Sequence, residues 1–265
     1  MVFSGITPTE QELIDYYSGY PVHAEVSPIT LKRYDALLDG FERYRRTNRV
    51  IDVGCGAGNF LQRAALRGWE VHGTEYGRIP IETCRAKGIN VIEGPLDPTR
   101  YADSSFDVVT SFEVIEHLVD PSAELERMSR ILRPGGLLYV TTPNYRCVGH
   151  LLAGKRWTVV NYPEHLNHFT PRTLSRLLRS KGYQPLRLLT TGIDLMRVRV
   201  KPSDDRSNRG AIDNQQEALR HRLDGSAWLR LVKRIVDGTL NFLGIGDHMK
   251  AWAERPTAPA RPGDT

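Results

Sequence analysis

Between residues 50 and 143, short runs of β-branched residues alternate with helical patterns. Such alternation is typical of consecutive βαβ units, whose parallel strands form a sheet covered by helices on both faces. The alternation therefore predicts an α/β fold of the doubly wound type. We expect five strands here: Val50–Gly54, Glu70–Glu75, Ile89–Gly94, Phe106–Ser111 and Gly136–Pro143.

Two of the expected helices have clear starting signals. Asp120 followed by Pro121, and Thr170 followed by Pro171, each place a capping side chain directly before a first-turn proline. After the second helix, Gln184–Thr191 predicts a sixth strand, and the alternation of Met249, Ala251 and Ala253 predicts a seventh.

Composition is that of an ordinary globular protein, with 40% hydrophobic and 25% charged residues in 265. No stretch approaches the roughly 18 apolar residues of a membrane span, and the first residues lack a secretory pattern. We therefore expect a cytoplasmic protein. Three cysteines without a C-x-x-C pair argue against a disulfide framework or a cysteine-rich zinc site.

The net charge of +5 is concentrated in one region. Such a cluster suits an anionic partner, whether a phosphate, a lipid headgroup or RNA, although a solvated helix face is the more common explanation. The basic residues between 172 and 201 are Arg172, Arg176, Arg179, Lys181, Arg187, Arg197, Arg199 and Lys201.

A glycine-rich loop follows the first expected strand, with glycines at 54, 56 and 58. Glycines at the carboxyl edge of a parallel sheet allow a ligand to approach the backbone closely. A nicotinamide dinucleotide fingerprint would place its third glycine where Asn59 stands. Glu75, which ends the second strand, offers a carboxylate for both ribose hydroxyls. Together these features favour an adenosine-containing ligand over a tight turn without one.

The sequence resembles the class I S-adenosylmethionine-dependent methyltransferases. The resemblance is carried by D-V-G-C-G-A-G from Asp52, the acid Glu75, F-D-V-V from Phe106, E-V-I-E-H-L from Glu113 and L-R-P-G-G from Leu132. It implies a Rossmann-like sheet of seven mostly parallel strands, in the order 3-2-1-4-5-7-6 with strand 7 antiparallel. It also implies S-adenosylmethionine (SAM) as the cofactor.

The same resemblance implies roles for individual residues around the cofactor. Pro95 occupies a position where many relatives have an aspartate that reaches the adenine, so the Leu96 N–H and the Asp97 carboxylate are the available substitutes. The implied contacts are Gly54, Cys55 and Gly56 to the methionine part, Asp52 beneath its amino group, Phe112 near it through its backbone, Glu75 to the ribose and Tyr76 to one adenine face.

Glu113, Glu116 and His117 would converge on one face if residues 112–118 formed a helical turn. This E-x-x-E-H pattern resembles ubiquinone-biosynthesis O-methyltransferases and small-RNA 2′-O-methyltransferases, which use a divalent cation. In the RNA enzymes a further histidine precedes a helix-opening threonine by five residues, which His165 matches before Thr170.

Three interpretations of this motif remain open. The group Glu113, Glu116, His117 and His165 could hold Mg²⁺ or Mn²⁺, because oxygen-rich ligation favours these ions over zinc. Without a metal, His117 or His165 could act as a general base. Glu116 and His117 could also be hydrogen-bonded pocket walls without any metal. The expected catalytic residues are His117, His165 and Glu113.

For the acceptor, we expect a hydroxyl group on a small molecule such as a sugar, a glycan precursor or a secondary metabolite. An RNA 2′-hydroxyl is the main alternative, and a catalytically inactive cofactor-binding module is an alternative from another class. Amino-methylating relatives usually have [DN]-P-P-[FY] after strand four, where this chain has Ser-Phe-Glu-Val from Ser111.

Three regions surround the expected core. Residues 1–47, with Tyr16, Tyr17 and Tyr20, are expected to form a helical cover, followed by a methyltransferase domain at 48–255 and a tail at 256–265. Residues 201–245 form an insertion within that domain. Its apolar helical segment 227–243 suits a lid, a membrane surface contact for a lipid-linked substrate or an oligomer interface.

Overall fold

The computed structural model describes the chain from residue 26 to 257 with gaps at 155–156, 158, 161–163 and 194–226, together with residues 2–3, 8–9 and 12. Three expectations lie outside these described residues. They concern the tyrosines at 16, 17 and 20, the first part of the insertion at 201–226 and the tail from 258 onward.

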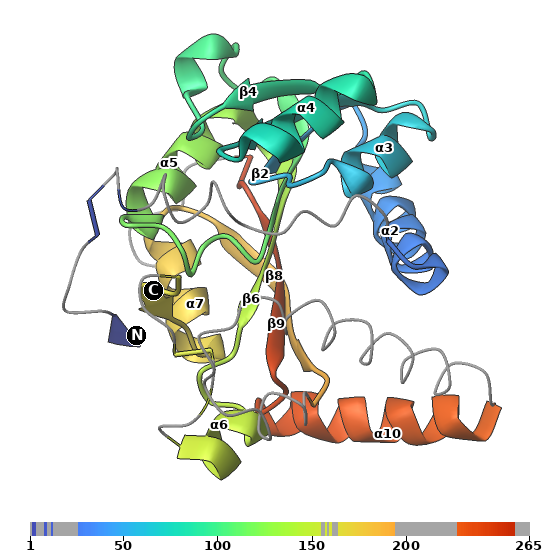
Figure 1. Ribbon diagram of the computed structural model, residues 1–265, viewed down its shortest axis with the longest axis vertical. Coiled ribbons are helices and arrows are strands. Elements are labelled where there is room, and N and C mark those ends of the chain that lie inside the picture. Colours follow the sequence, from blue (N-terminus) through green and yellow to red (C-terminus); the bar gives the residue numbers. More distant parts are fainter. Residues whose placement is uncertain are drawn as a thin grey trace.

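A seven-stranded sheet forms the centre of the molecule, in the order β4-β3-β2-β5-β6-β9-β8 (Figure 1). Strands β4, β3, β2, β5 and β6 are parallel, whereas β9 runs antiparallel to both of its neighbours. The predicted strand order and the antiparallel last strand are confirmed. The strands are β2 (Arg49–Val53), β3 (Glu70–Glu75), β4 (Asn90–Glu93), β5 (Phe106–Phe112), β6 (Leu132–Pro143), β8 (Gln184–Thr191) and β9 (His248–Glu254).

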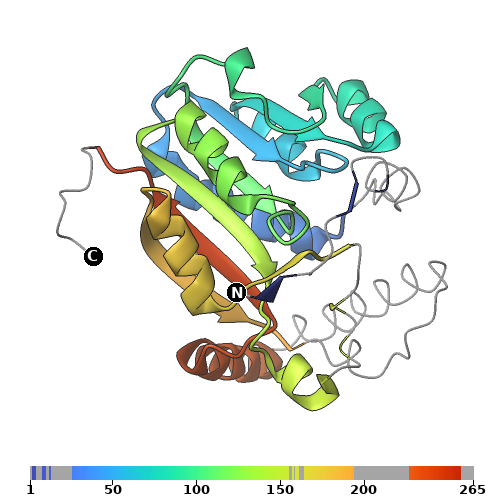
Figure 2. The same cartoon turned by 90° about the vertical axis from the view of Figure 1, so that its left-hand side faces the viewer.

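Helices cover both faces of the sheet, α2 and α3 on one side and α5 and α7 on the other (Figures 1 and 2). A separate two-stranded sheet pairs β1 (Val2–Phe3) with β7 (Asn167–His168). The helices are α2 (Pro28–Phe41), α3 (Asn59–Ala65), α4 (Arg78–Ala86), α5 (Pro121–Ile131), α6 (Val148–Ala153), α7 (Pro171–Ser180) and α10 (Ala227–Leu243), with 3₁₀ turns η1 (Glu42–Tyr44) and η2 (Pro98–Arg100).

Alternate residues of each strand pack into two separate cores. Val109 and Leu138 face α5 and α7, whereas their neighbours Val108 and Leu137 face α2, α3 and α4. Successive side chains of a strand point to opposite faces of a sheet. Because both faces are covered, the strands are continuously apolar rather than alternating in polarity.

The predicted helix starts are present as hydrogen-bonded caps. The Asp120 carboxylate accepts hydrogen bonds from Ser122 N and Ala123 N, and Thr170 forms a capping box with Thr173. Some strand ends differ from the predicted ones. β6 begins at Leu132 rather than at Gly136. Leu132 already pairs with Phe106 of β5, and the register of the pairing shifts before Val108 pairs with Leu137, so residues 133–136 lie within the strand.

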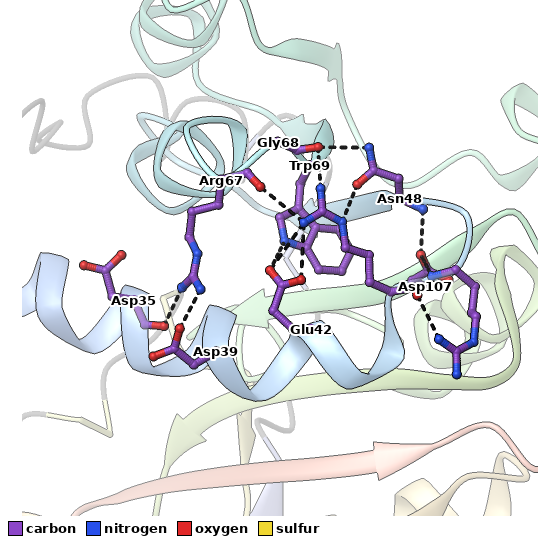
Figure 3. Close-up of polar contacts among 10 residues, drawn as sticks. Asp35, Asp39, Glu42, Asn48, Arg67, Gly68, Trp69 and Asp107 are labelled. Carbon is purple, nitrogen blue, oxygen red and sulfur yellow. Dashed lines mark hydrogen bonds and ion pairs between the residues drawn. The ribbon is translucent and has the colours of Figure 1, made fainter.

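Helix α2 is fastened to the sheet side through α3 and the loop that follows it (Figure 3). Arg67 bridges to the Asp39 carboxylate and to the Asp35 carbonyl oxygen, and Trp69 Nε1 donates to Glu42 Oε1 at 3.3 Å. Asn48 Nδ2 donates to the carbonyl oxygen of Gly68 at 2.9 Å. The described part of the N-terminal cover is therefore continuous with the core.

Helix α10 is attached to the edge strand β8 and extends away from the sheet (Figure 1). The backbone N–H of Thr190 on β8 donates to Asn241 Oδ1, and the Thr190 hydroxyl donates to the Leu240 carbonyl oxygen. Gly192 N donates to Asp237 Oδ1. Its role as a lid, a membrane contact or an interface stays a prediction. None of the described helices combines the length and apolar character needed to cross a membrane.

Candidate functional site

The glycine loop between β2 and α3 has a left-handed backbone at positions 54, 56 and 58. A Cβ at Gly54 would lie 2.5 Å from Val114 Cγ2, so only glycine fits there. A Cβ at Gly56 would meet nothing within 4 Å. The loop therefore has open space beside Gly56, as expected for a backbone that a ligand approaches.

Glu75 stands at the end of β3, directly beside this loop. Its Oε2 accepts a hydrogen bond from Gly56 N at 2.8 Å, and its Oε1 accepts from Tyr76 N and Gly77 N. These three backbone donors fix the orientation of the carboxylate. Since a carboxylate offers about four acceptor positions, it can still accept hydrogen bonds from a ribose diol.

Asp52 lies beneath the loop and is almost fully buried. Thr110 Oγ1 on β5 donates to its Oδ1 at 2.7 Å. Burial raises the pKa of Asp52 to about 8, against the opposing effect of the Thr110 hydrogen bond. A cationic amino group placed above Asp52 would favour its ionised form.

An aromatic group borders the same region. Phe112, at the end of β5, packs against Phe60 and Tyr139, with ring centroids 5.1 and 5.4 Å away. Tyr34 reaches this group from α2, and burial raises its pKa to about 12. Tyr34 was not among the predicted site residues, because a tyrosine on the apolar face of a helix looks like core in the sequence.

The residues expected near the adenine differ in their surroundings. Tyr76 is half exposed directly after Glu75, as a face for a stacked ring requires. Asp97 accepts from Thr99 N and Thr99 Oγ1 and so caps η2. The Leu96 N–H donates to the buried carboxylate of Glu124. Both substitutes for the missing aspartate thus have partners within the protein, and their adenine role stays a prediction.

The E-x-x-E-H segment is not a helical turn, which corrects one expectation. Glu113 has a left-handed backbone with φ of 53°, and a tight turn follows in which His117 N donates to the Val114 carbonyl. The Glu113 carboxylate lies 3.6 Å from Nδ1 of His248, the first residue of β9. His248 had no recognisable signal in the sequence.

Glu116, His117 and His165 come together instead. One potential ligand atom from each lies within 4.8 Å of the others. The loop that carries His165 is held against the motif because Leu166 N and Asn167 N both donate to the Glu116 carbonyl oxygen. The imidazoles of His117 and His165 lie 4.7 Å apart between centroids. This side-chain group, Glu116, His117 and His165, is called the carboxylate–histidine group below.

Backbone and side-chain contacts orient each member of this group. Nδ1 of His117 faces the carbonyl oxygen of Glu164, and Nδ1 of His165 faces that of Val159. A carbonyl oxygen can only accept a hydrogen bond, so each Nδ1 carries a proton. Thr142 Oγ1 donates to Oε2 of the buried Glu116 at 2.9 Å. Burial lowers the pKa of His117, which keeps it neutral near pH 7.

The donor set fits a divalent cation. Two imidazole nitrogens and one carboxylate oxygen are ligands for Mn²⁺ and similar transition-metal ions more than for Mg²⁺, which prefers oxygen. The shift from an oxygen-rich expectation arises because Glu113, one of the four expected ligands, is outside the group. Carbonyl partners on both Nδ1 atoms are also typical of histidines that bind metals.

Comparison with known proteins identifies the family. Residues 30–188 match a family model described as a methyltransferase domain. A ubiquinone biosynthesis O-methyltransferase of Pseudomonas putida (strain GB-1) is 30% identical over 179 residues, covering 62% of this chain and 74% of that protein. A protein of the same name from Aeromonas salmonicida is 28% identical over 147 residues, covering 51% of this chain and 62% of its own length.

Solved structures share the fold. A SAM-dependent methyltransferase from Archaeoglobus fulgidus superposes with a TM-score of 0.56 at 19% identity, covering 85% of this chain and 93% of that one. Geranyl diphosphate C-methyltransferase from Streptomyces coelicolor A3(2) has a TM-score of 0.60 at 16% identity, covering 94% and 99%. With the family match and the glycine loop described above, the chain belongs to the methyltransferase domain family and is a class I SAM-dependent methyltransferase.

Proposed function

We propose that the protein transfers the methyl group of SAM to a hydroxyl of a small-molecule acceptor, such as a sugar, a glycan precursor or a secondary metabolite. The observation that carries this proposal is the carboxylate–histidine group, in which two imidazoles, each with its Nδ1 directed to a backbone carbonyl oxygen, lie beside one buried carboxylate. A hydroxyl is a poor nucleophile until its proton is removed, and this group can remove it. The relatives named as O-methyltransferases support the same acceptor type.

The transfer itself needs one proton acceptor. The acceptor oxygen attacks the methyl carbon, the bond from that carbon to the sulfonium sulfur breaks, and S-adenosylhomocysteine leaves. The hydroxyl proton passes to Nε2 of His117 or His165. A general base placed in this way contributes on the order of a hundred- to ten-thousand-fold to the rate.

As the alternative to the general-base role of the imidazoles, the carboxylate–histidine group would hold a divalent cation, with Mn²⁺ as the best match to its donors. When bound, such a cation supplies a positive charge that lowers the pKa of a nearby hydroxyl. The protein residues then keep two tasks. Thr142 orients Glu116, and the carbonyl oxygens of Glu164 and Val159 hold the two imidazoles in one tautomer.

For the cofactor, we propose that Gly54, Cys55 and Gly56 line the methionine part, that Asp52 faces its amino group and that Glu75 binds the ribose. Support comes from the left-handed loop, the open space beside Gly56 and the fixed orientation of the Glu75 carboxylate.

The acceptor can be identified without a prior guess. Cell extract is incubated with enzyme and SAM that carries a deuterated methyl group, and labelled products are found by mass spectrometry. We expect a labelled small molecule that carries the deuterated methyl group on oxygen, as a methyl ether, rather than on nitrogen, as a methylamine. A His165→Ala variant should give no such product. A label found only on nitrogen or carbon would contradict hydroxyl methylation.

An RNA 2′-hydroxyl is the second candidate acceptor. One observation favours it: Arg172, Arg176 and Arg179 are exposed along one side of α7, which begins directly after the His165 loop. A basic face of this kind suits a phosphate backbone. Label recovered in nuclease digests of the extract, as a 2′-O-methyl nucleoside, would identify RNA. The complete lack of labelled product across extracts, with intact SAM binding, would instead indicate an inactive cofactor-binding module.

A further inference from the structure

Two cysteines meet at the cofactor loop. Cys55 is the central residue of the Gly54–Gly56 segment, and Cys84 lies on α4 opposite it. Their Sγ atoms are 3.8 Å apart, and the Cys84 thiol also faces the Gly56 carbonyl oxygen at 3.2 Å. The methyltransferase mechanism uses neither thiol as a reacting group. Their contact therefore calls for a separate explanation.

The surroundings of the two sulfurs differ in a way that suits thiol chemistry. Cys55 donates a hydrogen bond toward Cys84, and with the charge of Lys87 this lowers the pKa of Cys84 despite its burial. The same hydrogen bond and burial raise the pKa of Cys55. Lys87 is held in place by Ala57 O and Asn59 Oδ1 of the loop. The pair thus combines one thiol whose pKa is lowered with one whose pKa is raised.

The packing around the pair leaves little room for the sulfurs to move. A Cβ at Gly58 would lie 2.8 Å from Cys84 Sγ, and a Cβ at Gly73 on β3 would lie 2.6 Å from Cys55 Sγ. A disulfide bond of about 2.05 Å would require the sulfurs to approach by roughly 1.8 Å. Because Cys84 lies within α4 whereas Cys55 lies in a loop, a disulfide would have to form mainly by displacement of the loop.

We propose that Cys55 and Cys84 form an oxidisable dithiol, and that the disulfide between them displaces the glycine loop so that SAM binds less tightly. A hydroperoxide, the oxidant, first converts one thiol to a sulfenic acid and is itself reduced to an alcohol or to water. The second thiol then attacks that sulfur, an S–S bond forms and a water molecule leaves. Two thiols and one hydroperoxide thus give one disulfide, one alcohol or water, and one water.

Closure of the loop would affect cofactor binding through the neighbours of Cys55. Cys55 N donates to the Thr74 carbonyl oxygen at 2.9 Å, and the next residue, Gly56, donates its N–H to Glu75. A displacement of Cys55 toward α4 pulls on both of these bonds at once. The ribose carboxylate and the methionine loop would then lose their relative placement. Bound SAM should in turn hold the loop and slow the oxidation.

The test uses the full chain and SAM itself. Reduced and hydrogen peroxide-treated protein are compared by isothermal titration with SAM and by peptide mass spectrometry under non-reducing conditions. We expect a Cys55–Cys84 linked peptide, loss of two of the three free thiols, and SAM affinity lowered about tenfold or more. Dithiothreitol should restore the affinity, and saturating SAM should slow the loss of thiols.

Matched variants separate this effect from general oxidation. Cys147→Ser removes the third thiol, which caps α6, and should leave the response to peroxide unchanged. Cys84→Ser keeps a donor for Gly56 O and should bind SAM before and after peroxide. The proposal is overturned if no linked peptide forms, if linked protein binds SAM as well as reduced protein does, or if Cys84→Ser loses affinity equally.

This inference depends on the proposed position of SAM at the glycine loop, and the two can fail separately. If Glu75→Ala binds SAM like the unmodified protein and oxidation has no effect on SAM affinity, the placement of the cofactor is wrong. If Glu75→Ala weakens binding while the disulfide does not, only the dithiol proposal is wrong.

Discussion

The imidazoles of His117 and His165 lie 4.7 Å apart between centroids, and each directs its Nδ1 to a backbone carbonyl oxygen of the same loop region. Neither histidine is near the other in sequence. Their pairing depends on the two hydrogen bonds from residues 166 and 167 to the Glu116 carbonyl. The loop that carries His165 thus supplies one ligand atom and also the two carbonyl oxygens, of Val159 and Glu164, that fix the tautomers of both histidines. The site therefore depends on this loop being in place.

Removal of the His165 side chain should weaken metal binding. The His165→Ala variant loses one of three ligand atoms in the carboxylate–histidine group, so its Mn²⁺ affinity should fall by at least about tenfold. Free Mn²⁺ is measured by electron paramagnetic resonance. His150→Ala is the matched control, because His150 also directs Nδ1 to a carbonyl oxygen, that of Tyr145, outside this group. Equal Mn²⁺ binding by both variants would contradict the proposed site.

Thr142 should act on the same site through Glu116. Thr142→Val keeps the shape of the side chain but removes the hydroxyl that holds Glu116 Oε2, and its Mn²⁺ affinity should fall about ten- to a hundredfold. Thr142→Ser keeps the hydroxyl and should bind Mn²⁺ normally. SAM affinity, measured by calorimetry on the same samples, should not change. If valine and serine behave alike, Thr142 does not orient Glu116.

Glu75 should dominate ribose recognition. Glu75→Ala removes the acceptor at the end of β3, so SAM binding should weaken by more than about 1.5 kcal/mol, the scale of hydrogen bonds to a charged group. Glu93→Ala is the control, because Glu93 is the exposed β-sheet neighbour of Glu75 at the end of β4. Isothermal titration with SAM checks both. Unchanged affinity of Glu75→Ala would remove its role in ribose binding.

Asp52 should make stability dependent on pH. Its folded pKa of about 8 lies above the unfolded value of 3.8, so the folded state holds a proton that the unfolded state releases between these pH values. The free energy of unfolding contributed by Asp52 is therefore greatest below pH 4 and falls as pH rises to about 8. Asp52→Asn lacks this loss, so its Tm should rise relative to that of the unmodified protein as pH increases from 5 to 9. Parallel Tm profiles would contradict the raised pKa.

Asp107 should be essential for stability. Burial raises its pKa, but hydrogen bonds from Arg133 and from the N–H groups of Arg46 and Asn48 outweigh this and hold the pKa below its ordinary value. Asp107→Asn leaves Arg133 without its buried partner and should cost about 3–5 kcal/mol at pH 7 in urea unfolding. Because the native carboxylate loses its advantage as pH falls through its lowered pKa, the difference should shrink in acid.

The exposed pair Asp103–Arg130 provides the control for this prediction. Its side chains are 62% and 50% exposed, so Asp103→Asn should change the free energy of unfolding little. A small effect at Asp107, similar to that at Asp103, would indicate that the buried ion pair contributes nothing measurable.

Much of the fold could be predicted because its signals are local. Continuous apolar strands such as Val108–Val109 and capped helix starts such as Asp120–Pro121 are determined by neighbouring residues. The strand order and the family followed from motifs at strand ends, where a parallel sheet places its ligands. The ends of β6 were less predictable, because glycines and a proline inside a strand look like a turn.

The arrangement of the site was harder to predict. The left-handed backbone of Glu113 depends on the hydrogen bonds that its N–H makes to Thr141, and no residue type signals it in advance. Thr142 is buried and Tyr34 is partly buried against the core, so the roles of their polar atoms become visible only in three dimensions. Contacts between distant segments, such as Cys55 with Cys84, cannot be inferred from spacing either.

The attachment of α2 has a practical consequence for protein production. Leu38, Phe41 and Tyr44 belong to the core on the face of the sheet that α2, α3 and α4 cover. The family match already starts at residue 30. A truncated protein that begins at residue 48 would lack these residues, would expose the apolar surface of the sheet and of α3 that they cover, and is expected to aggregate. Fragments for crystallisation or directed evolution should therefore start no later than Ser27, the cap of α2.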